Sequence, residues 1–78
     1  MTLAELKPGQ SGSIKAIDTA SPGVLRLMVL GLIEGVDVRF ENTAIGGDPM
    51  EISVFGASIS VRKDQARSFT LERAAASG

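Results

Sequence analysis

The sequence has no cysteine and no histidine among its 78 residues. Disulfides need cysteine, and the usual zinc, haem and iron–sulfur sites need cysteine or histidine, so none of these sites is expected. The lack of histidine also removes the commonest general base and the partner of histidine-activated nucleophiles. Composition therefore predicts a protein without catalytic residues, without a cofactor and without a specific metal site.

Tryptophan and tyrosine are also absent, and phenylalanine occurs only three times. An aromatic groove for proline-rich peptides, or an aromatic platform for nucleic-acid bases, is therefore not expected. Nine acidic and eight basic side chains give a net charge of −1, whereas nucleic-acid-binding domains usually carry a basic excess. We expect no nucleic acid among the partners of this protein.

Long apolar runs are missing as well. The longest, from Val24 to Ile33, is interrupted by Arg26 and Gly31 and is too short to cross a bilayer. The N-terminal residues lack the basic start and apolar core of a signal peptide, so we expect a cytoplasmic protein without membrane insertion. The length predicts one domain over residues 1–73 and a flexible tail over residues 74–78.

Alternating apolar and polar residues mark the strands of this domain. In the first strand, Ile14 and Ala16 are expected to share one face, while Ile17 breaks the alternation. The later strands at 36–41 and 50–55 alternate strictly, which is typical of half-buried antiparallel strands. The predicted strands are 11–18, 36–41, 50–55, 58–62 and 69–71, and the predicted single helical turns are 2–6 and 63–67.

A helix is predicted from Pro22 to Leu30. Ser21 suits the N-cap, and Pro22 suits the first helical position because its missing N–H is not needed there. Gly31 suits the residue after the helix, where a positive φ closes the last turn. Gly35 is likewise interpreted as a turn residue that adopts a positive φ.

Five short strands, with a helical turn before the last one, favour a mainly β fold. The best fit is a small five-stranded SH3-like barrel with one helix inserted between the first two strands. The main alternative is an OB-fold, which also has five strands and one helix. Its helix usually follows the third strand, and this sequence does not place one there.

The predicted helix has apolar residues on both sides. Val24, Leu27 and Leu30 lie on the side expected to face the core, whereas Leu25 and Val29 lie on the other. Met28 lies at an edge and Arg26 at the seam, and we expect Leu25, Met28 and Val29 to be exposed together. Because a helix on a small barrel buries one face, the second apolar side predicts an exposed surface for a partner or a second copy. The alternative is that loops or the N-terminal turn cover these side chains.

Other candidate residues have simpler explanations. Asp48 before Pro49 is an ordinary start of a turn, although a functional loop is an alternative. Two carboxylate pairs, Asp48 with Glu51 and Glu34 with Asp37, are loosely spaced and make poor iron sites, since Fe²⁺ prefers some imidazole.

Phe55 lies out of phase with the apolar residues of its strand. It is therefore either exposed at the following reversal or tucked under it.

Four motifs in sequence order resemble the FeoA family, ferrous iron transport protein A. Residues 3–9 (LAELKPG) resemble the family's L-x-x-L-x-P-G start, and residues 26–35 (RLMVLGLIEG) resemble its R-L-x-x-L-G-L-x-P-G segment. Residues 44–49 (AIGGDP) resemble its A-P-L-G-D-P loop, and residues 61–66 (VRKDQA) resemble its L-R-x-x-x-A turn. Glu34 departs from the pattern where the family has proline, as do Ile45 and Gly46 where it has Pro-Leu. The motif residues interpreted as structural are Leu27, Leu30, Gly31, Leu32, Gly35, Gly47, Asp48 and Pro49.

The resemblance implies an SH3-like barrel with a role in ferrous iron uptake. It implies docking on the cytosolic G domain of FeoB, a membrane ferrous-iron transporter. The candidate interface residues come from the apolar pattern of the helix itself, and they are Leu25, Arg26, Met28 and Val29. The family commonly has polar residues at the positions of Leu25 and Val29. The alternative is a free-standing regulatory barrel related to the C-terminal domain of DtxR-type iron-dependent repressors. Self-association through the helix is a further expectation.

Overall fold

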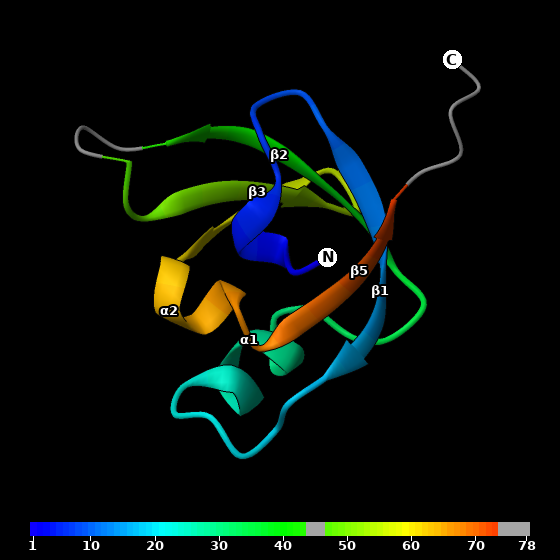
Figure 1. Cartoon of the computed structure of the whole chain (residues 1–78), viewed down its shortest axis with the longest axis vertical. Coiled ribbons are helices and arrows are strands. Elements are labelled where there is room, and N and C mark those ends of the chain that lie inside the picture. Colours follow the sequence, from blue (N-terminus) through cyan, green and yellow to red (C-terminus); the bar gives the residue numbers. More distant parts are fainter. Residues whose placement is uncertain (44–46, 74–78) are drawn as a thin grey trace.

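The computed structural model describes residues 1–43 and 47–73. Residues 44–46 of the A-P-L-G-D-P loop and the predicted tail at 74–78 lie outside the described residues. Five antiparallel strands form one curled sheet in the order β4-β3-β2-β1-β5 (Figure 1), which confirms the mainly β prediction. The strands are β1 (Ser11–Ile17), β2 (Asp37–Thr43), β3 (Met50–Val54), β4 (Ala57–Val61) and β5 (Phe69–Arg73).

Three short helical elements complete the described chain. The 3₁₀ turn η1 (Leu3–Glu5) precedes β1, helix α1 (Val24–Val29) lies between β1 and β2, and helix α2 (Lys63–Ala66) lies between β4 and β5. Figure 1 shows α1 and α2 together at one end of the curled sheet. The fold therefore uses its helices to cover an open end of the sheet.

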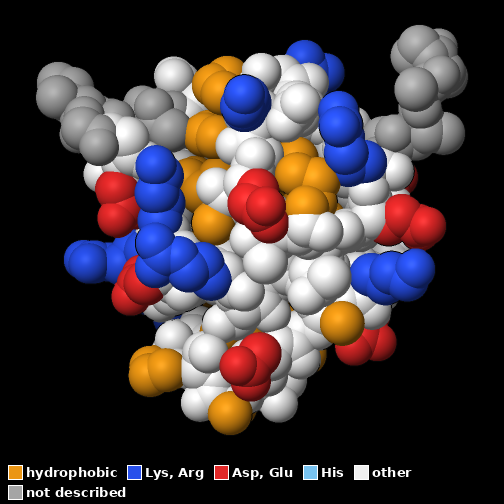
Figure 2. Space-filling model, viewed as in Figure 1, with side chains coloured by type: hydrophobic (Ala, Val, Ile, Leu, Met, Phe, Trp, Pro, Cys, Tyr) orange, Lys and Arg blue, Asp and Glu red, His pale blue; other side chains and the backbone are white. Residues whose placement is uncertain are grey.

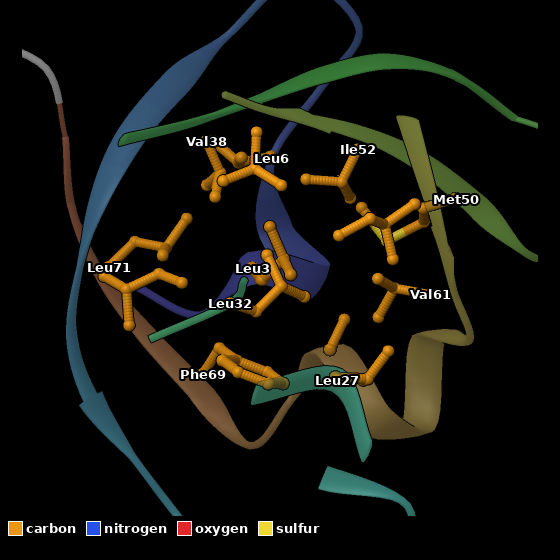
Figure 3. Close-up of a cluster of buried hydrophobic side chains, with 14 of the residues drawn as sticks. Leu3, Leu6, Leu27, Leu32, Val38, Met50, Ile52, Val61, Phe69 and Leu71 are labelled. Carbon is orange, nitrogen blue, oxygen red and sulfur yellow. The ribbon is translucent and has the colours of Figure 1, made fainter. Parts of the chain in front are cut away.

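The core fills the inside of the curled sheet (Figure 3). Strict alternation in β3 is confirmed, since Met50, Ile52 and Val54 are buried while Glu51 and Ser53 are only half-buried. Residues from every strand and from all three helical elements meet in this core. Its largest fully buried members are Phe69, Leu3, Ile14, Leu32, Met50, Ile52, Val24, Val38 and Val61.

Strand β1 contains a β-bulge that its sequence pattern did not predict. Ile14 pairs with Leu71 of β5, whereas Ala16 pairs with Thr70, so the residue between them is inserted into the ladder. Ile14 is buried as expected, but the placement of Ala16 on the same face was wrong, because Ala16 is exposed. The extra residue shifts the alternation by one position and turns Ile17 toward the core.

The N-terminus closes one edge of the sheet. Thr2 bridges Thr70 of β5, and the N–H of Leu71 donates to the carbonyl oxygen of Met1 at 2.6 Å. The backbone N–H of Thr2 donates to the Glu5 carboxylate, and this bond lowers the pKa of Glu5 below its ordinary value. η1 is thereby held against β5, with Leu3 in the core as its apolar spacing predicted.

Helix α1 begins later than predicted. Its N-cap is Gly23, with φ of 81°, and no side chain caps the first turn. The predicted cap at Ser21 was wrong because its hydroxyl lies 3.5 Å from the Asp18 carboxylate instead. Residues 18–23 form turns before the helix, so the N–H of Val24 donates to the carbonyl oxygen of Ser21 at 3.4 Å.

The end of α1 is fixed by a Schellman motif. The N–H of Leu32 donates to the carbonyl oxygen of Leu27 at 3.1 Å, and the N–H of Gly31 donates to that of Met28 at 3.0 Å. Gly31 has φ of 122°, a conformation that side chains rarely adopt, so the predicted helix stop is confirmed. The motif brings Leu32 into the core beside the buried Leu27.

The expected burial of Leu30 was wrong, since its side chain is 52% exposed. Leu30 is the C-cap residue, and the chain reverses directly after it. Leu32 therefore occupies the inward position that the helical spacing assigned to Leu30.

This difference predicts unequal effects of the same truncation at two leucines. Leu27→Ala removes buried methyl groups and should lower the free energy of unfolding by about 2–4 kcal/mol. Leu30→Ala removes an exposed side chain and should lower it by less than about 0.5 kcal/mol. Urea unfolding followed by circular dichroism measures both changes, and equal losses would contradict the observed placement of Leu30.

Candidate interaction surface

Large apolar side chains that the core does not use gather near α1. Leu25 and Val29 of α1 are 63% and 87% exposed, so the predicted exposure of these two residues is confirmed. Leu30 and Ile33 are exposed after the helix, and Phe55 is 79% exposed in the turn between β3 and β4. We call the set the apolar patch: Leu25, Val29, Leu30, Ile33 and Phe55.

The patch joins segments that are distant in the sequence. Leu25 and Val29 are four residues apart on α1, which makes their side chains neighbours on one helix face. A Cβ placed on Gly31, next to Leu30, would lie 3.9 Å from Cδ2 of Phe55. The tip of the β3–β4 hairpin, which carries Phe55, therefore lies beside the chain reversal that ends α1.

Two other predicted interface residues behave differently. Met28 was expected to be exposed, but it is half-buried and packs against the core, because it lies one helical turn after the buried Val24. Arg26 is exposed, and it forms no ion pair with any residue that the structure describes. Arg26 thus places an available positive charge among the exposed apolar residues of α1.

Phe55 occupies a strained position. It has φ of 52° and Gly56 has φ of 77°, so both residues of the turn between Val54 and Ala57 have positive φ. Such turns favour Asn-Gly, because asparagine tolerates this conformation and a bulky side chain does not. A large, exposed and strained aromatic residue indicates a functional constraint rather than a contribution to folding.

The geometry resolves the two interpretations of Phe55 in favour of exposure. The sequence signal was a phenylalanine before glycine in a two-residue turn, a position where asparagine is the usual residue. Periodicity alone did not reveal it, because a residue out of phase can lie on either side of a strand.

In each of the two acidic pairs, one carboxylate accepts a hydrogen bond from a residue outside the pair. The Asp48 carboxylate accepts a hydrogen bond from the N–H of Lys63 at 3.0 Å, which ties the segment before β3 to α2. The Ser13 hydroxyl donates to the Asp37 carboxylate, which ties the start of β2 to β1. Within residues 1–43 and 47–73, no group of three or more acidic residues could hold a metal ion.

The described residues enclose no pocket for a small molecule. On the face drawn in Figure 2, basic and acidic side chains are interspersed, without a large area of either sign. No helix of the described chain is long and apolar enough to span a membrane. The exposed apolar residues with Arg26 among them offer apolar contact and a nearby charge, a combination found at protein–protein interfaces.

Comparison with protein-family models identifies one family. The FeoA domain model matches residues 1–73. The chain is similar to the FeoA protein of Chlorobium tepidum, with 33% identity and a TM-score of 0.86 over 100% of this chain and 74% of that one. It is also similar to Stenotrophomonas maltophilia FeoA, with 26% identity and a TM-score of 0.79 over 92% of this chain and 89% of that one.

The Stenotrophomonas protein was crystallised with zinc and is described as an SH3 domain protein and a candidate ferrous iron transport activating factor. A further similar structure is IdeR from T. acidophilum, with 25% identity and a TM-score of 0.81. That match covers 95% of this chain and 34% of IdeR. Comparison with curated proteins gives no match.

Relief of the strain at Phe55 predicts a more stable protein. Phe55→Asn should raise the free energy of unfolding by about 1 kcal/mol, because asparagine adopts positive φ at lower cost. Phe55→Ala is the matched control, since it also removes the ring but keeps a Cβ-bearing residue that disfavours this conformation. Thermal unfolding of both variants measures the effect, and equal stability of the two would contradict backbone strain at this turn.

Proposed function

Because the chain belongs to the FeoA family, we propose that it is an accessory protein of ferrous iron uptake, which docks on the cytosolic G domain of a FeoB-like transporter and modulates it. The observation that carries this proposal is the apolar patch, which the fold exposes although the core is small. The protein acts in the cytoplasm through this contact and performs no reaction of its own.

The physical basis for docking is desolvation of the patch. Burying a leucine, valine or phenylalanine side chain stabilises a complex by roughly 1.5–3 kcal/mol, before the costs of association. Leu25 and Val29 lie on a helix, whose rigid backbone presents them with little loss of conformational entropy. Arg26 between them adds a charge that can select an acidic rim on the G domain.

A second candidate function follows from the similarity to IdeR. In this alternative the chain is a free-standing regulatory barrel that binds another protein of iron regulation. A binding measurement with the G domain distinguishes the two functions, because only the transport role requires the chain to bind that domain.

Substitution of two patch residues tests the docking. Leu25→Ser combined with Val29→Ser should weaken binding to the purified G domain by about tenfold or more, since central apolar contacts dominate such interfaces. Isothermal titration calorimetry measures the change. The unfolding temperature should stay close to that of the unsubstituted protein, because both side chains are exposed. Unchanged affinity would place the docking surface elsewhere.

A matched pair of charge reversals tests the role of Arg26. Arg26→Glu should slow association with the G domain and reduce its dependence on salt, because the charge lies within the patch. Arg39→Glu is the control, since Arg39 is equally charged and exposed but lies on β2, where it pairs with Glu41 at 3.7 Å. Stopped-flow kinetics at two salt concentrations compare them, and equal effects would indicate only a change in net charge.

A further inference from the structure

The two edges of the sheet differ in their protection. The β5 edge is covered by the N-terminus through the Thr2–Thr70 bridge, and it carries the charged residues Glu72 and Arg73. The β4 edge has no such cover, because β3 is its only strand neighbour and no other backbone hydrogen bond reaches β4 from the described residues. Exposed strand edges readily pair with another strand.

Strand β4 also lacks the features that usually prevent such pairing. Its sequence, Ala-Ser-Ile-Ser-Val, contains no charge and no proline. Its register with β3 is regular over all five pairs, whereas the β1–β5 and β2–β3 ladders each contain a register shift. A short, regular and uncharged edge is thus available to a second strand.

The outward-facing backbone groups of β4 can be assigned from the hairpin. Val54 and Ala57 flank a two-residue turn and therefore exchange hydrogen bonds with each other. Because hydrogen-bonded and non-hydrogen-bonded pairs alternate, Ser58 and Ser60 direct their N–H and C=O groups away from β3. Both side chains are exposed, so neither blocks an approaching strand.

We propose that the β4 edge pairs with β4 of a second copy of this chain, antiparallel and about a two-fold axis at Ile59. This register places Ser58 opposite Ser60 of the second copy, and Ser60 opposite Ser58 of the second copy. Both pairs are hydrogen-bonded pairs of the antiparallel ladder. The serine hydroxyls face each other on the outer side of the joined sheet, where they can hydrogen-bond.

The charges near β4 are compatible with this symmetric pairing. Arg62 lies opposite Gly56 of the second copy, so the basic residues that follow β4 are at opposite ends of the joined strands. No like charges face each other in this register. The strand is its own complement, which favours a second copy over an unrelated extended peptide.

The dimer formed in this way is weak. Stable complexes bury about 800 Å² on each partner, and an edge of five residues covers less than that. The pairing therefore requires high protein concentration. It does not use the apolar patch, so this proposal and the docking proposal can fail independently.

Two measurements on the whole chain test the pairing. Analytical ultracentrifugation up to millimolar concentration should show the mass rising from 8.1 kDa toward twice that value. In the same range, amide NMR signals of Ser58 and Ser60 should shift, while those of Leu25 and Val29 should not. Shifts confined to α1 would overturn the proposal in favour of self-association through the helix, and a monomer at all concentrations would overturn it outright.

Lysine substitutions on β4, compared with one on β3, provide a further test of the pairing. Ser58→Lys combined with Ser60→Lys places like charges opposite each other in the dimer, and should weaken dimerisation by about tenfold, or about 1.4 kcal/mol. Ser53→Lys is the control, because Ser53 pairs with Ser58 within the sheet but does not lie at its edge. Equal effects of the two variants would overturn the proposal, as would Ser58 and Ser60 signals that shift only on addition of the G domain.

Discussion

The reversal of the chain at Gly31 determines both the core and the exposed surface. The bond from the Leu32 N–H to the Leu27 carbonyl, at 3.1 Å, ends α1 and returns the chain to the core within two residues of the C-cap. Leu27 and Leu32 are buried by this reversal, whereas Leu30 is left outside. A Cβ at Gly31 would be 3.9 Å from Phe55, so the same turn brings the β3–β4 hairpin against the helix. One backbone conformation therefore holds two parts of the apolar patch together.

The sequence predicted those parts of the fold that depend on a single local preference, such as strand alternation or the positive φ of glycine. Met50, Ile52 and Val54 are buried as alternation requires, and Gly31 ends the helix as its conformational freedom suggests. The bulge in β1 was not predictable, because an inserted residue is defined by pairing with β5, which lies more than fifty residues later in the chain. Ser21 failed as a cap for a local reason, since Asp18, three residues earlier, competes for its hydroxyl.

The candidate site was predictable to the same extent. Surplus apolar residues on the helix identified Leu25 and Val29, because helical periodicity separates them from the side that faces the core. Phe55 and Ile33 could not be added in this way, since their proximity to α1 depends on the path of the chain after the helix. Local patterns thus located the centre of the patch, and only tertiary structure defined its extent.

A thin core makes the exposure of these side chains costly for the free protein. In a domain of 78 residues, a few buried apolar side chains supply much of the stability. Five large apolar groups in water, with one of them at a strained φ of 52°, are therefore an unfavourable arrangement for a protein that acts alone. A partner that covers the patch binds only the folded state, so it stabilises the domain by mass action. In the proposed complex, burial of the patch offsets the strain at Phe55, so the domain is expected to be more stable in that complex than on its own.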